Sequence, residues 1–291
     1  MSGATGEPSP LRVLATRSWA LAALGVVAAV VTCVMLGLWQ FHRFEAKSAR
    51  ADLIEHNYSA PPVALTDVLP ASDSPLAADD GWRTVRLTGE YCTAPECVLY
   101  ARNRPFNGEV GFAQLVPFRT DDGTVMVARG WVPTQSASSA PADPPEVPTG
   151  ERTIIVRLRP MEPVLAGRTN PPGQVQSIAI EELAAVEPAA GTLHRGAYGE
   201  LASEDPAPAD APTPFPRPDT SLGPHLSYAV QWWAFALFFP IAWAVRARRA
   251  VLDEIELRRR GGAAQPVRAR RAPARSRDEE EEDALLDELR A

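Results

Sequence analysis

Two short stretches of this 291-residue chain bring together side chains that could bind a ligand or a metal. In each stretch, three members spaced i, i+3 and i+7 would share one side of a helix, starting at Gln40 in the first and at His225 in the second. A neutral imidazole can ligate iron, and a guanidinium can pair with a carboxylate such as a haem propionate. If the stretches are neighbours, they predict a haem-handling site. The two sets are Trp39, Gln40, His42, Arg43 and Lys47, then His225, Tyr228, Gln231 and Trp232.

The same residues also fit a simpler explanation. Tryptophan and tyrosine are enriched at the membrane–water interface, and long basic side chains extend toward lipid headgroups. Such anchors are common, which favours this explanation for Tyr228 and Trp232. Gln231 lies slightly deeper, where an amide prefers a hydrogen-bonding partner. Both alternatives stay open at this point: a haem site, or an interfacial belt of ordinary composition.

Each set lies at one end of a long apolar run. Residues 18–39 form 22 positions without a charge, and residues 226–245 form 20. A helix needs about 20 apolar residues to cross about 30 Å of hydrocarbon, so each run can span a bilayer. Arg12 and Arg17 before the first run also suit a signal peptide, but the run exceeds the usual apolar region and lacks a small-x-small cleavage site. We therefore predict two retained transmembrane helices.

Basic residues set the predicted orientation. Residues 246–277 hold 11 arginines and three acidic residues. By the positive-inside rule this segment and the N-terminus at 1–17 are cytoplasmic, so residues 44–200 form an extracytoplasmic domain. Residues 201–224 are rich in proline and read as an extended tether to the second helix. The tail at 246–291 is Arg-rich and then acidic, and we expect it to be largely disordered.

The region between the two runs predicts a β-rich domain. Several segments alternate apolar and polar side chains with the period of a half-buried strand, as in "WRTVRLTGEY". The turn at 121–123, Asp-Asp-Gly, is a strong hairpin signal. The fold class is therefore an α+β membrane protein, with two transmembrane helices flanking one antiparallel β-rich extracytoplasmic domain. The predicted strands are 82–91, 98–104, 111–120, 124–133 and 152–160, followed by a strand leading into a short helix at 174–186.

The three cysteines are Cys33, Cys92 and Cys97. Cys92 and Cys97 bracket four residues between two predicted strands, and an extracytoplasmic location permits oxidation. We expect a disulfide there; the alternative is two free thiols. Cys33 lies inside the first apolar run, where it would serve packing.

Most enzyme signatures are missing from the sequence. It contains no P-loop, GxSxG, HExxH or CxxCH motif, and His56 and His194 have no evident partners in sequence. No nucleic-acid motif stands against the membrane interpretation. We expect neither enzymatic activity nor a permanently bound cofactor, although an extracytoplasmic enzyme with unrecognised residues stays a weak third alternative.

Five segments resemble the Surf1 family of cytochrome c oxidase assembly factors. They are "GLWQFHRFEAK" from Gly37, "VRLTGEY" from Val85, "ARNRP" from Ala101, "DGTVMVARGWVP" from Asp122 and "HLSYAVQWWAFA" from His225. Their order and spacing agree with the family from about residue 36 to 240. The acidic end of the tail and the paired cysteines depart from the family pattern. These two features, with the bias toward arginine over lysine, suit an actinobacterium.

The resemblance implies a function in a bacterial cell membrane. The chain would assist the biogenesis of the haem–copper (aa3-type) oxidase, by helping haem a insertion into the catalytic subunit. His225 would ligate the haem iron, with Arg43, Tyr228, Gln231 and, as a weaker candidate, His42 around a transiently bound haem a. Gly130 and Trp131 match a hairpin element and would be structural. The expected interface with oxidase subunits, or with a respiratory supercomplex, is Trp39, Gln40, Trp232, Trp233 and Phe235.

One alternative of a different class remains within the same resemblance. The chain could be a permanent accessory subunit of the respiratory oxidase, with no haem role. The aromatic second span suits contact with other helices or with lipid under either hypothesis. The sequence does not separate the two.

Overall fold

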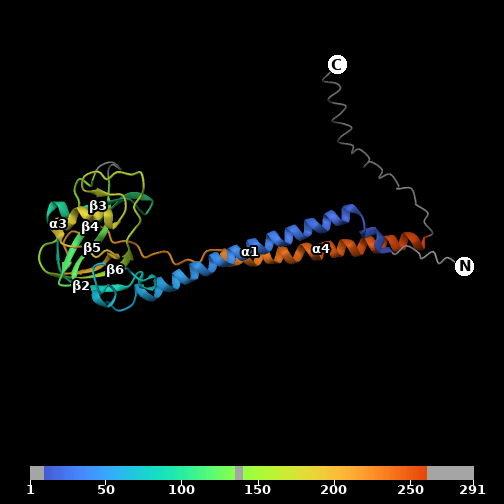
Figure 1. Cartoon of the computed structure of the whole chain (residues 1–291), viewed down its shortest axis with the longest axis horizontal. Coiled ribbons are helices and arrows are strands. Elements are labelled where there is room, and N and C mark those ends of the chain that lie inside the picture. The colour runs from blue at the N-terminus through green and yellow to red at the C-terminus, as the bar shows by residue number, and fades with distance from the viewer. Residues whose placement is uncertain (1–9, 135–139, 261–291) are drawn as a thin grey trace, which may run out of the picture. The chain divides into compact units, whose positions relative to one another are not determined.

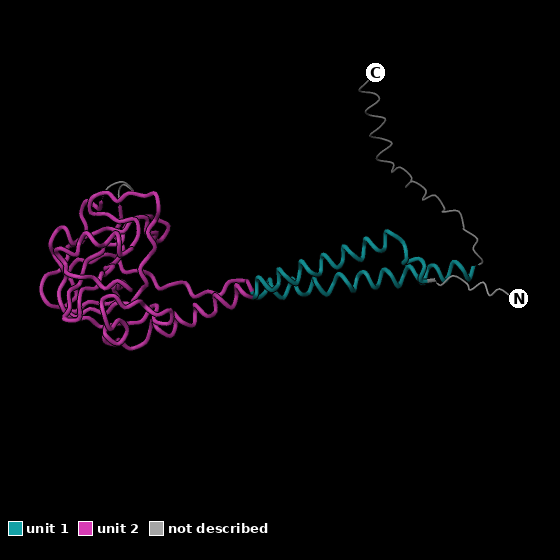
Figure 2. The backbone as a smooth tube through the Cα atoms, viewed as in Figure 1, with its two compact units in different colours: residues 1–41, 226–291 teal, residues 42–225 magenta. Residues whose placement is uncertain are grey.

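The computed structural model describes residues 10–134 and 140–260. They belong to two compact units: residues up to 41 and from 226 onward form one, and residues 42–225 form the other (Figure 2). The first unit consists mainly of two long helices, and the second contains an eight-stranded sheet (Figure 1). The helices are α1 Arg17–Tyr58, α2 Ile180–Leu183, α3 Glu187–Ala190 and α4 His225–Arg259.

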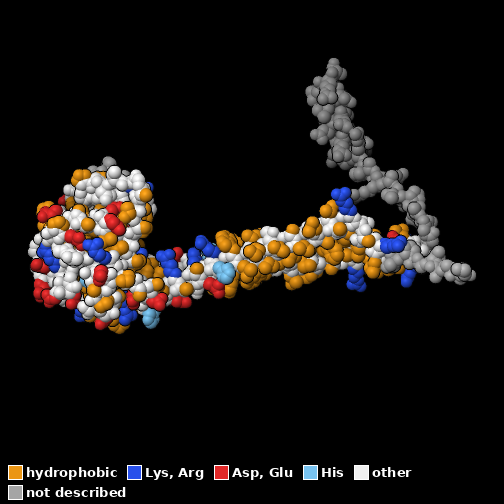
Figure 3. All heavy atoms as spheres, in the orientation of Figure 1, with side chains coloured by type: hydrophobic (Ala, Val, Ile, Leu, Met, Phe, Trp, Pro, Cys, Tyr) orange, Lys and Arg blue, Asp and Glu red, His pale blue; other side chains and the backbone are white. Residues whose placement is uncertain are grey.

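The apolar parts of α1 and α4 pack side by side. The ring of Trp19 lies 6.0 Å from that of Trp243, and the ring of Phe41 lies 5.8 Å from that of Trp233, so the two helices run antiparallel. Both are long and apolar enough to cross a membrane. Hydrophobic side chains cover most of their visible surface (Figure 3). Such a surface is unfavourable in water and matches lipid, which makes this chain a membrane protein.

Both long helices continue beyond the predicted spans. Helix α1 continues to Tyr58, and α4 continues to Arg259. Residues 246–259, which we expected to be disordered, are therefore helical. Pairs spaced i, i+4 support this extension, as where Arg258 Nε donates to Glu254 at 2.8 Å. The tail from residue 261, including its acidic end, lies outside the described residues.

The sheet closes on itself. Its strands follow the order β1-β2-β6-β8-β5-β4-β3-β7, and a further pairing between β2 and β4 completes a ring of β2, β6, β8, β5 and β4. All the strands predicted from the sequence are present. The bounds are β1 Val63–Ala64, β2 Thr84–Tyr91, β3 Leu99–Phe106, β4 Glu109–Thr120, β5 Gly123–Pro133, β6 Arg152–Pro160, β7 Gln174–Val175 and β8 Ala197–Asp205.

The prediction of an antiparallel sheet is wrong, because the sheet is mixed. The pairs β1–β2, β3–β7 and β5–β8 are parallel. Parallel neighbours require a crossover connection, and the connection from β5 to β8 contains β6, which pairs antiparallel with β8. The prediction of a tether from residue 201 is wrong for residues 201–205, which belong to β8. The last three residues of β8 are polar and two of them are exposed, which hid the strand from pattern analysis.

Two hydrophobic clusters stabilise the second unit. One draws residues from all five strands of the ring, and so fills its interior. The other lies on the outer face of β4 and β5, beneath the segment 175–193. Strands β4 and β5 are consequently buried on both faces, which accounts for their nearly continuous apolar sequence. Strand β6 has one buried face and alternates, as predicted.

Candidate functional site

Trp233 packs against α1 through a glycine. A Cβ placed on Gly37 would lie 2.5 Å from Cδ1 of the Trp233 ring, so only a glycine lets the indole approach this closely. The Trp233 side chain is therefore largely used inside the helix pair. Of the other residues predicted to face a partner, Trp39 and Phe235 are exposed, and Gln40 and Trp232 are partly exposed. The ring of Trp232 lies 6.0 Å from that of Phe235.

His225 is partly buried at the start of α4. Tyr228 follows three residues later, near the same side of the helix, and is 47% exposed. Gln231, six residues after His225, is exposed and lies about 120° around the helix. Helix α4 therefore keeps Tyr228 near His225 and turns Gln231 away.

Lys47 and His225 both lie close to Gly223. A Cβ on Gly223 would lie 3.6 Å from Lys47 Nζ and 3.7 Å from Cδ2 of His225, so both side chains approach one glycine. Arg43 is exposed. His42 is exposed and its Nδ1 lies 3.1 Å from Glu45 Oε2, one turn along the same helix. The helical spacing of Gln40, Arg43 and Lys47 did not reveal that Lys47 lies near Gly223. This proximity depends on the backbone conformation of the last tether residues, which the spacing does not predict.

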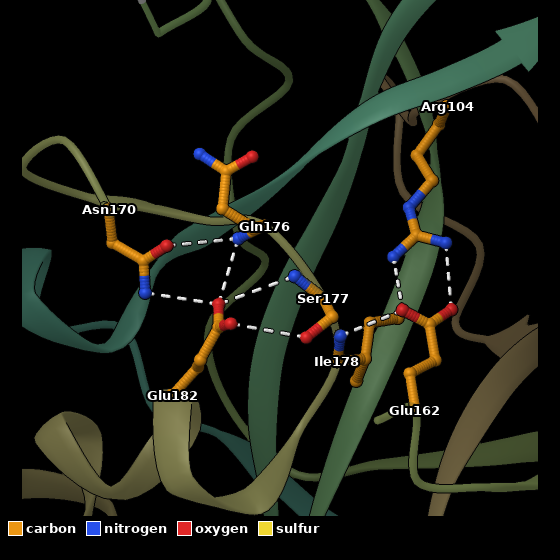
Figure 4. Close-up of polar contacts among 7 residues, drawn as sticks. All are labelled: Arg104, Glu162, Asn170, Gln176, Ser177, Ile178 and Glu182. Atoms are coloured by element: carbon orange, nitrogen blue, oxygen red, sulfur yellow. Dashed lines mark hydrogen bonds and ion pairs between the residues drawn. The ribbon is translucent and has the colours of Figure 1, made fainter. Parts of the chain in front are cut away.

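A second polar site lies in the sheet domain and was missed by sequence analysis. The two terminal nitrogens of Arg104, Nη1 and Nη2, donate to the Glu162 carboxylate at 2.7 and 2.6 Å. The backbone N–H of Ile178 also donates to Glu162, at 2.9 Å (Figure 4). Burial by itself would raise the pKa of Glu162. The hydrogen bonds from Arg104 and Ile178 outweigh it, and the pKa is lowered.

Glu182 completes this site from the first turn of α2. Its carboxylate accepts from the backbone N–H of Gln176 at 2.8 Å, from the Ser177 hydroxyl at 3.2 Å and from the Asn170 amide at 3.0 Å (Figure 4). Glu162 and Glu182 together fix the segment that follows β7. A Glu-Glu pair at the start of a short helix was the available sequence signal.

A cavity of about 180 Å³ opens beside the Arg104–Glu162 pair. Trp131 and Phe215 form apolar walls, and Tyr198 and Glu200 supply polar groups. Burial raises the pKa of Tyr198 to about 12, and it also raises the pKa of Glu200 against the opposing effect of Arg159. These groups form no nucleophile–base arrangement. Among residues 10–134 and 140–260, no three potential ligands group as a metal site would require.

Gly130 and Trp131 hold the tether against β5. The N–H of Trp131 donates to the Thr213 carbonyl at 2.7 Å, and the N–H of Thr213 returns a bond at 2.9 Å. A Cβ on Gly130 would lie 2.6 Å from the Thr213 carbonyl oxygen. The indole N–H of Trp131 donates to the Arg104 carbonyl at 2.8 Å. Both residues therefore have structural contacts.

The preceding residue, Arg129, is buried at the bulge where β4 and β5 lose register. Only 2% of its surface is exposed. Its Nη1 donates to Gln114 Oε1 at 2.8 Å, and its Nη2 lies 3.7 Å from Glu204, which also pairs with Arg152 at 2.9 Å. An arginine inside the apolar run "TVMVARGWV" was the sequence signal for this cluster.

The cysteine pair forms the expected bond. Cys92 and Cys97 are joined by a disulfide and lie in the cluster that covers β4 and β5. Cys33 is buried in the helix pair with its thiol free. The disulfide closes the loop between β2 and β3 and takes no part in either polar site.

The SURF1 family model matches residues 27–237. Uncharacterized SURF1-like proteins of Mycobacterium tuberculosis and Mycobacterium bovis are 35% identical over 262 residues, which is 88% of this chain and 92% of theirs. A SURF1-like protein of Rickettsia felis is 26% identical over 99 residues, which is 34% of this chain and 40% of the relative.

Proposed function

This chain belongs to the SURF1 family, which is generally linked to cytochrome oxidase assembly, and on this premise we propose that it assists biogenesis of the aa3-type cytochrome c oxidase. The observation that carries the proposal is the extent of the family match. Residues 27–237 include most of the apolar part of α1, the whole sheet domain and the first part of α4. The partners would be oxidase subunits, above all the catalytic subunit that bears haem.

The proposed location is a bacterial cell membrane, with both termini in the cytoplasm. Arginines follow the apolar part of α4, and Arg12 and Arg17 precede that of α1. This charge pattern supports an extracytoplasmic position for the sheet domain. The Cys92–Cys97 disulfide is compatible with an oxidising compartment. The mycobacterial relatives favour an actinobacterial source.

The finer proposal is that the chain helps to insert haem a, and that His225 would hold the haem iron. Its imidazole and the Lys47 ammonium both lie close to Gly223, and a cation at that position could pair with a haem propionate. His225 and Lys47 thus fit the chemistry of the group. Tyr228 would lie on the same side of α4, whereas Gln231 would contact haem only from a second direction. When bound, haem supplies an iron centre to which an imidazole nitrogen can bind.

A second candidate function is that of a permanent accessory subunit of the oxidase without a haem role. It is favoured by the exposed aromatic side chains of the helix pair, such as Trp39, Phe235 and Phe238. Large aromatic side chains at an apolar surface suit contact with neighbouring helices as well as with lipid. Neither function requires a catalytic residue in this chain, and we propose none.

The haem role is tested by purifying the full chain from membranes that make haem a. The absorption spectrum of the wild type is compared with His225→Ala and with His56→Ala, which changes an exposed histidine outside the predicted haem set, as the matched control. We expect a haem a spectrum in the wild type and in His56→Ala, and its loss in His225→Ala. Haem that survives in His225→Ala removes this residue as ligand.

Two further measurements separate the alternatives. Stoichiometric amounts of the chain in the mature oxidase, with no haem in any sample, would favour the accessory subunit. The family-level function is tested independently by deleting the gene and measuring assembled oxidase in membranes. An unchanged oxidase level would contradict both candidates.

A further inference from the structure

A larger cavity, of about 450 Å³, lies beside the second half of α1. We call it the basic cleft. It lies wholly within the unit formed by residues 42–225. One wall is α1, another is the end of β6, and the third is the end of the tether. Its polar and aromatic lining includes Lys47, Arg50, Trp82, Arg159, Asp219 and Thr220.

Aromatic rings hold one guanidinium in the lining of this cleft and two more at Tyr58, whose ring lies 6.0 Å from that of Trp82. The guanidinium of Arg159 lies 3.7 Å from the centre of the Trp82 ring. Arg157 and Arg217 lie 3.6 and 5.1 Å from the centre of the Tyr58 ring. Stacking occupies the flat face of a guanidinium and leaves its N–H groups at the edge for hydrogen bonds. Pre-ordered arginines of this kind lose little entropy when they bind an anion.

The positive charges exceed the negative charges that face them. Asp219 is committed to Ser221, accepting from its N–H at 2.8 Å and from its hydroxyl at 2.9 Å. Glu200 pairs with Arg159 at 3.3 Å. Arg50 has no ion pair within the described parts of the chain, 10–134 and 140–260. Among the described residues that line the cleft, three are cations, namely Lys47, Arg50 and Arg159, and one is a carboxylate, Asp219.

The position of the cleft along α1 indicates which anion it meets. Lys47 follows Trp39, the last residue of the uncharged run, by eight positions on one continuous helix. At about 1.5 Å per residue this is about 12 Å, and a lysine side chain can extend back toward the headgroup layer. The opposite wall, at 218–221, ends four residues before α4 begins at His225. Both walls of the cleft therefore continue directly into membrane helices.

We propose that the basic cleft binds the phosphate of an anionic phospholipid headgroup. Lys47 and Arg50, spaced i, i+3 on α1, would contact the phosphate oxygens from one side, and Arg159 would contact them from the other. A phosphate bears full negative charge in this compartment and accepts several charge-assisted hydrogen bonds. Lipid binding at this cleft does not depend on haem and is separate from the Arg104–Glu162 site.

The proposal is tested with the full chain in detergent, by native mass spectrometry. Phosphatidylglycerol is the anionic probe and phosphatidylcholine the zwitterionic one. The Lys47→Ala/Arg50→Ala double variant is compared with Arg86→Ala/Arg168→Ala, which removes two exposed arginines outside the cleft. Lys47→Arg/Arg50→Lys restores the charge. Circular dichroism checks that every variant is folded.

We expect the wild type to bind phosphatidylglycerol in preference to phosphatidylcholine. Loss of two charge-assisted contacts should weaken this binding by roughly 10-fold or more, while the control and the charge-restoring variant should bind as the wild type does. Equal binding of both lipids, or undiminished binding by the Ala double variant, would overturn the proposal.

A competition experiment distinguishes binding of a lipid headgroup from binding of free phosphate. Inorganic phosphate at millimolar concentration is added to the complex with phosphatidylglycerol. We expect the lipid to stay bound, because its acyl chains and the adjacent apolar helices add affinity. Full displacement by inorganic phosphate would reassign the cleft to a soluble anion and overturn the lipid proposal. The haem a spectrum is not used, so this result is independent of the proposed oxidase function.

Discussion

The ammonium of Lys47 and the imidazole of His225 both lie close to Gly223. A Cβ on this glycine would lie 3.6 Å from Lys47 Nζ and 3.7 Å from His225 Cδ2. Gly223 has a φ of 65°, a left-handed conformation that glycine adopts without strain. The turn that begins α4 thus brings its first residue to a cation that is 178 positions earlier in the chain. This relationship gives the proposed haem ligand a charged neighbour.

Gly37→Leu should destabilise the helix pair. The new side chain would overlap the rigid ring of Trp233, and overpacking of this kind costs about 1–3 kcal/mol. Thermal unfolding in detergent, followed by near-UV circular dichroism, measures the loss. Gly25→Leu is the matched control, because nothing lies within 4 Å of its Cβ position. Equal melting temperatures for the two variants would contradict the packing described here.

Gly130→Ala should release the tether from β5. The added methyl group meets the Thr213 carbonyl and Pro212, so the paired bonds between Trp131 and Thr213 cannot both form. Limited proteolysis should then cut residues 206–220 faster than in the wild type. Gly81→Ala provides the control, since its nearest neighbour would be at 3.6 Å, an ordinary contact. An unchanged cleavage rate in Gly130→Ala would show that the tether is held by other contacts.

Arg129→Met should lower the free energy of unfolding by about 1–3 kcal/mol, because it removes the donor to the buried Gln114 side chain, whereas Glu204 keeps its pair with Arg152. Urea unfolding in detergent, monitored by tryptophan fluorescence, gives the value. Arg86→Met removes an exposed arginine from β2 and should change stability by less than about 0.5 kcal/mol. A similar small effect for both variants would mean that the buried charge cluster adds no net stability.

The Arg104–Glu162 pair should make stability depend on pH. The folded pKa of Glu162 is lower than its ordinary value of 4.5, so the unfolded chain takes up a proton at higher pH than the folded chain does. Its stabilisation is therefore fully present above pH 4.5 and is lost as the pH falls through the lower, folded pKa.

This pH dependence is tested by measuring the melting temperatures of the wild type and of Glu162→Gln over a range of pH. The difference between their melting temperatures should be constant near neutral pH and should shrink as the pH falls below about 4.5. A difference that stays the same down to the lowest pH tolerated by the fold would contradict a lowered Glu162 pKa. Asp73→Asn, at a position for which no hydrogen bond or ion pair is observed within the described parts of the chain, serves as the control.

The sequence alone determined the features that depend on neighbouring residues. Uncharged runs of 22 and 20 residues predict two membrane helices, because spanning depends only on length and hydropathy. Alternation and turn residues located five strands between residues 82 and 160: β2, β4, β5 and β6 of the ring, and β3 beside it. The family resemblance rested on short motifs in a fixed order. Family membership is confirmed.

Tertiary structure decided what depends on residues far apart in the chain. The pairing of β2 with β4 closes the ring, and β8 enters it as a parallel neighbour of β5 with an exposed, polar end that hid the strand. Ala229, one turn after His225, is buried in the fold, whereas Tyr228 and Gln231 are exposed. Lys47 becomes a neighbour of His225 only because the tether ends in a left-handed glycine. Local patterns carry no information about such contacts, since each is made between residues about 70 or more positions apart in the chain.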